Sequence, residues 1–227
     1  MTRKHLFSIL LFIGMASSLS AQIGTTETDT ELWLKAGADF KLGEKWSFGI
    51  EEQLRFDNRI GEVKNYHTEL EVKYDLTDQL DLRFATRYVR KNAVPEEEEF
   101  FRYQFGAGYK HEWNRLEFKH RVLFQNRNEI GVSENQGDIP RHYLRLRSGI
   151  EYKIRDWKYD PIFRAEYFEA LNGAKAGTDD GVRFSVGTER KYDGIGEFGI
   201  FYLYEHTINA IDTEINHIIS LRYSYSF

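Results

Sequence analysis

The chain of 227 residues contains no cysteine and only 3 prolines. The absence of cysteine excludes a disulfide framework, a thiolate metal site, a cysteine nucleophile and a lipid anchor on cysteine. The scarcity of proline leaves few positions at which a strand must break. Long apolar runs are also absent beyond the first residues, so no transmembrane helix is expected in the remainder of the chain.

The amino terminus has the pattern of a secretory signal peptide. Arg3 and Lys4 supply positive charge, Leu6–Met15 is apolar, and Ala16–Ala21 is rich in small residues. The apolar run is too short to span a membrane. We therefore predict a cleaved signal peptide at residues 1–21, followed by one exported domain at residues 22–227.

The predicted domain repeats a single strand pattern. Aromatic residues make up 15% of the chain, and large apolar residues alternate with polar ones in eleven segments. The segments are 32–42, 46–56, 66–76, 80–88, 101–109, 115–127, 143–152, 161–168, 182–190, 197–205 and 215–227. Because side chains alternate between the two faces of a strand, each segment has one apolar face and one polar, mostly charged face.

The connections between these segments alternate in length. Short ones lie at 43–45, 77–79, 111–114, 154–158 and 193–196, and longer ones at 57–64, 91–99, 128–140, 170–181 and 206–214. This alternation is typical of outer-membrane barrels, whose strands are even in number in single-chain bacterial proteins. We therefore expect a further strand in Gln22–Glu31. The predicted fold is an all-β, single antiparallel transmembrane β-barrel of twelve strands, with ten as the alternative.

An exported soluble β-sandwich would also show alternating strands, and the mean hydropathy of −0.58 is typical of soluble proteins. However, the apolar faces are almost uniformly large and aromatic, and the segments match the roughly 9 to 11 residues of a membrane-spanning strand. The last segment alternates Tyr223, Tyr225 and Phe227 and ends there, which resembles the carboxyl-terminal assembly signal of outer-membrane barrels. These features favour the barrel.

In a membrane barrel the charged faces line the interior. The predicted lumen-lining residues are Arg55, Glu69, Glu71, Arg83, Arg87, Arg102, Arg121, Arg145, Arg147, Glu151, Arg164, Glu166, Arg183 and Arg222. They fit either a self-paired salt-bridge network that fills a structural barrel or a narrow channel for small polar solutes. Their composition does not separate the two hypotheses. Glu52 is an exception on an apolar face, and we predict a β-bulge at Glu51 and Glu52 that turns both carboxylates inward.

An outer-membrane lipid hydrolase is the alternative from another functional class. It would need a histidine and a serine on one face, oriented by a third polar group. His217 and Ser220 are predicted to point to opposite faces, and a pair formed across strands stays open. We predict no catalytic residues, no metal site and no cofactor.

The amino-terminal third of the predicted domain resembles a known family. The similarity is clearest over Thr30–Asn92, in "EEQLRF" after Trp46, in "TELEVKYDL" and in "RYVRKN". These motifs resemble an uncharacterised barrel family of Bacteroidota outer membranes, known only as a domain of unknown function. The resemblance extends over the whole predicted domain and implies an outer-membrane barrel. It supplies no functional residues.

The sequence thus predicts an integral protein of the outer membrane of a Gram-negative bacterium. Its expected partners are outer-membrane lipid and lipopolysaccharide, with the barrel-assembly machinery during insertion. No nucleic-acid partner is expected, and the solute is not specified by the sequence.

Overall fold

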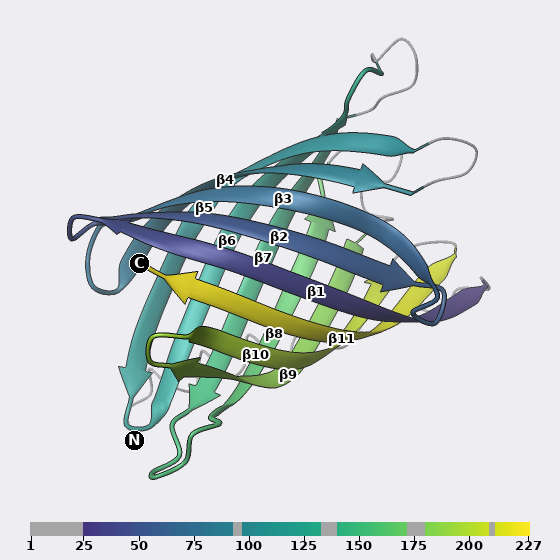
Figure 1. Cartoon of the computed structure of the whole chain (residues 1–227). Helices are drawn as coiled ribbons and strands as arrows, with labels where there is room; N and C mark the ends of the chain where they lie inside the picture. Colours follow the sequence, from purple (N-terminus) through teal and green to yellow (C-terminus); the bar gives the residue numbers. More distant parts are fainter. Residues whose placement is uncertain (1–24, 93–96, 133–139, 172–179, 209–211) are drawn as a thin grey trace, which may run out of the picture.

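The protein folds into one closed β-barrel (Figure 1). The structure, a computed structural model, describes residues 25–92, 97–132, 140–171, 180–208 and 212–227. Eleven strands are present in this part of the chain. They are β1 (Thr26–Leu42), β2 (Trp46–Asp57), β3 (Glu62–Asp75), β4 (Leu80–Lys91), β5 (Glu98–Trp113), β6 (Leu116–Glu129), β7 (Arg141–Tyr152), β8 (Pro161–Ala170), β9 (Asp180–Tyr192), β10 (Gly196–Ile208) and β11 (Thr213–Ser226). The predicted signal peptide and its cleavage site lie outside the described residues.

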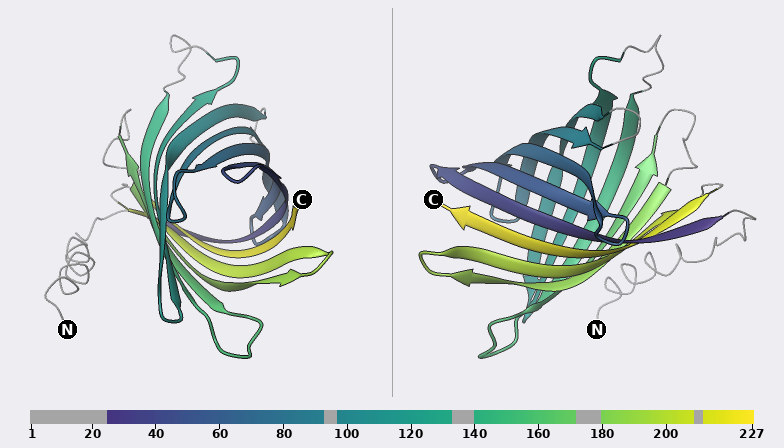
Figure 2. Two further views of the ribbon diagram at one scale, coloured as in Figure 1. Left: turned by 90° about the vertical axis from the view of Figure 1, so that its left-hand side faces the viewer. Right: turned by 45° about the vertical axis from the view of Figure 1, so that its right-hand side comes forward.

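The barrel closes through a parallel pair, because an odd number of consecutive strands leaves the first and last running in the same direction. β1 pairs with β11 from Thr26 opposite Thr213 to Asp39 opposite Ser226. The other neighbouring strands are antiparallel, and Figure 2 (left) shows the strands as a closed ring. All five connections that follow β1, β3, β5, β7 and β9 therefore lie at one end, called here the turn end. The opposite end is called the loop end.

The predictions of twelve and ten strands are both wrong. Residues 26–31, which we expected to form part of a separate strand, are the beginning of the 17-residue β1. Their side chains are all polar, threonine alternating with an acidic residue, and they pair with β11 over their full length. The alternation therefore gives the correct strand positions, whereas the expectation of an even count does not hold.

The connection between β2 and β3 is tighter than predicted. It contains only residues 58–61, and Asn58, Arg59 and Ile60 adopt positive φ angles of 49°, 58° and 68°. Such backbone is unfavourable for residues other than glycine unless local contacts hold it. The carboxylate of Asp29 on β1 accepts hydrogen bonds from the backbone N–H groups of Asn58 and Arg59, at 2.8 Å and 2.9 Å. This side chain stabilises the turn from the neighbouring strand.

The predicted bulge at Glu51 and Glu52 is wrong. The register of β1 and β2 is continuous there, so Glu52 remains on the outward face, where the hydroxyl of Thr68 donates a hydrogen bond to it at 2.9 Å. The register shift lies instead between β2 and β3, where Lys64 is the extra residue. This bulge turns the Lys64 ammonium inward, and it forms an ion pair with Glu31 at 2.6 Å.

The carboxyl terminus is fixed against β1 at the turn end. The backbone N–H of Phe227 donates to the carbonyl of Asp39 at 2.9 Å. The Phe227 ring stacks on Phe40, with ring centroids 4.7 Å apart and planes 3° from parallel, and also contacts Tyr225 at 4.7 Å. The last residue thus contributes to the seam that closes the barrel. No helix long and apolar enough to cross a membrane occurs in the described part of the chain.

Candidate functional site

The barrel encloses a polar cavity of about 820 Å³, called here the lumen. Thirteen of the fourteen residues predicted to face inward line it: Arg55, Glu69, Glu71, Arg83, Arg87, Arg102, Arg121, Arg145, Arg147, Arg164, Glu166, Arg183 and Arg222. Glu151 is not among the lining residues. It lies nearer the turn end, where the Lys119 ammonium contacts its carboxylate at 3.3 Å.

The charges of the lumen are unevenly distributed around its circumference. Its lining includes fifteen basic and ten acidic residues, although the whole chain has a net charge of −5. The inward faces of β4 to β7 form what we call the basic wall, with nine basic residues against the acidic Glu98 and Glu129. The nine are Arg83, Arg87, Lys91, Arg102, Arg121, Arg127, Arg141, Arg145 and Arg147. The excess of positive charge in the lumen therefore lies on one side.

The strands opposite the basic wall carry the compensating acids. β1 to β3 contribute five acidic side chains to the lining, Glu31, Asp39, Glu51, Glu69 and Glu71, and three basic ones. β8 to β11 contribute equal numbers of each sign. Because the two sides differ in sign, a transverse electric field crosses the lumen, and such a field orients a dipolar or charged solute.

Carboxylates shared between arginines connect the two sides. Glu69 Oε2 lies 2.6 Å from Arg87 Nη2 and 3.0 Å from Arg102 Nη2. Glu166, only 7% exposed, accepts from Arg145 at 2.7 Å through one oxygen and from Arg183 at 3.2 Å through the other. Charge-assisted hydrogen bonds of this kind are about twice as strong as neutral ones. They hold several arginine side chains in fixed positions.

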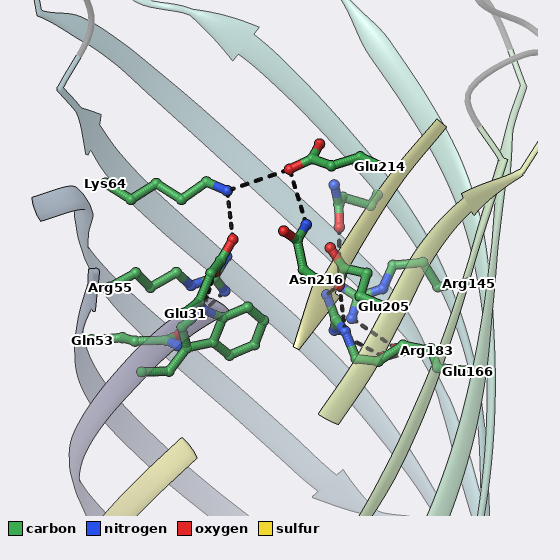
Figure 3. A network of polar contacts seen from close by, with 12 residues as sticks. Glu31, Gln53, Arg55, Lys64, Arg145, Glu166, Arg183, Glu205, Glu214 and Asn216 are labelled. Carbon is green, nitrogen blue, oxygen red and sulfur yellow. Dashed lines mark hydrogen bonds and ion pairs between the residues drawn. The ribbon is translucent and has the colours of Figure 1, made fainter. Parts of the chain in front are cut away.

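A second network begins at the bulge residue Lys64 (Figure 3). The Lys64 ammonium lies between Glu31 at 2.6 Å and Glu214 at 3.9 Å, and the Asn216 amide donates to Glu214 at 3.0 Å. Glu31 is nearly fully buried, and its other oxygen accepts from the Trp33 indole at 2.6 Å. This carboxylate is therefore satisfied by two strong donors, which explains how it tolerates burial.

An apolar cluster also occupies part of the interior, and the sequence pattern did not predict it. Trp33, Ile162, Phe201, Leu203 and Ile218 are all buried and pack together on the inward faces of β1, β8, β10 and β11. The signal in the sequence is that these apolar residues interrupt the polar faces of their strands, most clearly Phe201 and Leu203 in one segment. Three members of the cluster, Trp33, Phe201 and Leu203, also line the lumen beside charged residues of the same strands.

Aromatic rings and arginine side chains meet at the edge of this cluster. The Arg55 guanidinium lies over the Trp33 ring at 3.8 Å, and the Arg183 guanidinium lies 5.2 Å from the same ring. Arg183 also forms an ion pair with Glu205. Cation–π contacts of desolvated arginines are worth about 2 kcal/mol. They hold the Trp33 ring at the wall of the lumen.

A histidine and a serine do meet across strands, but on the outward face. His120 Nδ1 lies 2.9 Å from Ser148 Oγ, and the neighbouring Arg121 and Arg147 face the lumen. In the described residues no carboxylate is hydrogen-bonded to His120, whose ring stacks instead on His111 with centroids 5.6 Å apart. The pair therefore lacks the third group that orients a catalytic histidine. His217 and Ser220 point to opposite faces: His217 bonds to Tyr202 outside, and Ser220 lines the lumen.

The turn end carries its own group of charges. Lys153, in the connection after β7, contacts Glu117 at 2.8 Å and Glu112 at 3.1 Å. These hydrogen bonds raise the pKa of Lys153 above its ordinary value, with Glu117 the larger contributor. In the described ranges no three His, Asp or Glu side chains lie close enough together to hold a metal ion.

Known proteins similar to this chain include a solved barrel structure and a protein family. No curated protein matches the sequence. A solved structure of the NanC porin is similar with a TM-score of 0.45 and 10% sequence identity, over 81% of this chain and 90% of that chain. Residues 30–216 match the model of a family described as "Protein of unknown function (DUF2490)". Because this match covers most of the chain, including all or part of every strand, the protein belongs to the DUF2490 family.

Proposed function

We propose that the protein is an integral β-barrel of the Gram-negative outer membrane and forms a narrow channel for small polar solutes. The observation that carries the proposal is the inversion of polarity between its two surfaces. A charged cavity of about 820 Å³ lies inside a barrel whose outward face is apolar. This inversion is the reverse of a soluble protein, where apolar side chains are buried and charged ones face water.

The outward face supports a lipid environment. Each of the eleven strands exposes at least one large hydrophobic side chain, for example Leu34, Phe48, Leu70, Phe84, Phe105, Val122, Leu146, Phe163, Val186, Ile200 and Leu221. Soluble monomers rarely expose apolar patches beyond a few hundred Å². An apolar exterior around the whole circumference fits lipid acyl chains, and a closed barrel leaves no unpaired strand edge in them.

Aromatic residues near the turn end support placement at a membrane interface. Trp46, Trp113 and Tyr109 are exposed near the ends of their strands, and Trp157 and Tyr159 lie in the connection after β7. Tyrosine and tryptophan are enriched where the hydrocarbon region meets water. Outer-membrane lipid and lipopolysaccharide are therefore the proposed surroundings. The terminal Tyr223, Tyr225 and Phe227 are the proposed signal for the barrel-assembly machinery.

A conductance measurement tests the channel. The refolded protein would be inserted into planar lipid bilayers in potassium chloride, with protein-free detergent as the control. Discrete channel openings are the expected result. A silent bilayer, despite correct insertion, would contradict the channel and leave a structural barrel with a salt-bridged interior.

The hydrolase alternative is tested on the same preparation. Release of fatty acid from phospholipid vesicles would be measured for the wild type and for Ser148→Ala, which removes the hydroxyl next to His120. We expect no release from either protein. Release by the wild type that Ser148→Ala abolishes would assign the outward pair a catalytic role and contradict the channel-only proposal.

A further inference from the structure

Two arginines of the basic wall face each other directly across neighbouring strands. Arg121 on β6 is the register partner of Arg147 on β7, and both side chains line the lumen. Residues opposite one another on the same face of an antiparallel pair have Cβ atoms about 4.5–5.5 Å apart, and like charges in that arrangement are destabilising. The pair therefore needs a compensating negative charge nearby.

The protein does not provide that charge as an ion pair. In the described part of the chain, neither guanidinium has a carboxylate within 4.0 Å. Glu166 is the register partner of Arg147, but its oxygens are engaged by two other arginines. The acids near Arg121 are likewise engaged, since Arg83 pairs with Glu71 at 2.9 Å and with Asp81 at 2.6 Å.

The unpaired arginines are reachable from the cavity. Both are partly exposed to the lumen, and further basic residues of the same wall, Arg127 and Arg141, extend to the loop end of the cavity. A guanidinium offers a planar set of N–H donors that matches the two oxygens of a carboxylate or phosphate. Two guanidinium groups side by side can therefore hold one oxyanion between them.

We infer that Arg121 and Arg147 form a binding site for the carboxylate or phosphate group of a small anionic solute. The site would make the lumen prefer anions, and the basic residues towards the loop end would guide them to it. A solute of this class must be small, because the entire cavity has a volume of about 820 Å³. The statement about selectivity rests on the proposed channel, whereas the statement about binding does not.

Binding is tested first, without any need for conduction. Inorganic phosphate would be titrated calorimetrically into the full barrel in detergent, for the wild type and for the double variant Arg121→Gln, Arg147→Gln. Hydrogen bonds to charged groups contribute about 1.5–3 kcal/mol, so we expect affinity to fall about tenfold or more. Circular dichroism would verify that the variant is folded.

Two double variants serve as controls. Arg164→Gln with Arg222→Gln removes the same charge from the lumen, at two arginines that pair with Glu189 at 3.3 Å and 3.5 Å, and should keep phosphate binding. Arg59→Gln with Arg155→Gln removes two arginines at exposed positions outside the lumen and should leave the affinity for phosphate unchanged. Equal loss in the two lumen variants would overturn the assigned site in favour of a general charge effect.

Selectivity is tested by the reversal potential in bilayers under a potassium chloride gradient. The wild type should favour chloride, and Arg121→Gln with Arg147→Gln should reduce that preference. A conducting wild type that shows no anion preference and binds no phosphate would overturn the inference and leave the channel intact. Phosphate binding by a protein that does not conduct would support the site and contradict the channel.

Discussion

Replacement of Glu166 by Gln is the sharpest test of the interior ion pairs. Glu166 is 7% exposed and contacts Arg145 at 2.7 Å and Arg183 at 3.2 Å. The amide has nearly the same shape, but it removes the negative charge and turns N–H donors towards a guanidinium. Removal of one partner from a buried ion pair typically costs about 3–5 kcal/mol. Water in the lumen screens part of this interaction, so we expect the free energy of unfolding to fall by about 3 kcal/mol.

The assay is urea unfolding of the barrel in phospholipid vesicles, followed by tryptophan fluorescence. The matched control is Glu112→Gln, whose carboxylate is 65% exposed and contacts Lys153 at 3.1 Å. Exposed ion pairs are worth about 0–1 kcal/mol, so this variant should unfold almost as the wild type does. Equal stability of the two variants would refute the reasoning. That result would mean that water in the lumen stabilises the charges of Arg145 and Arg183 as well as the Glu166 carboxylate does.

Three further predictions concern single positions. Gly187→Ala should destabilise the barrel by about 1–3 kcal/mol in the same unfolding assay, because the added Cβ would overlap the carbonyl of Ile200. Gly181→Ala on the same strand is the control and should be close to neutral, because the atom nearest to its added Cβ lies 3.6 Å away. Deletion of Phe227 should reduce insertion measured as membrane-fraction yield, and normal insertion would argue against an assembly signal. Glu52→Leu should stabilise the barrel in vesicles by about 1 kcal/mol or more, because it removes an outward carboxylate from lipid; a destabilised variant would show that Glu52 does not face acyl chains.

The faces of the strands could be predicted from alternation because side chains on a strand must point to opposite sides. Arg83, Arg121 and Arg183 line the lumen for this reason alone. The partners of these residues could not be predicted. Arg183 bonds to Glu166 on one neighbouring strand and to Glu205 on the other, and both contacts depend on the strand register, which the local sequence does not specify.

A wrong prediction and a feature that was not predicted have a common physical origin. The predicted bulge at Glu51 and Glu52 rests on the cost of an outward carboxylate in lipid, but Thr68 offsets part of that cost with a hydrogen bond to Glu52 from the next strand. The bulge occurs at Lys64, where an inward turn brings its ammonium to the buried Glu31. In both cases a cross-strand contact decides the outcome, and neither contact is visible from one strand by itself.

The parallel seam between β1 and β11 has a consequence for engineering the chain. Since both strands run from the loop end to the turn end, Thr26 and Phe227 lie at opposite ends of the barrel. Phe227 lies level with Phe40 of β1. A strand rises about 3.3 Å per residue, so the stretch of β1 from Thr26 to Phe40 separates these positions by on the order of 46 Å along the strand. In a barrel with an even strand number they would meet at one rim. Circular permutation here therefore needs a linker that spans the full height of the wall.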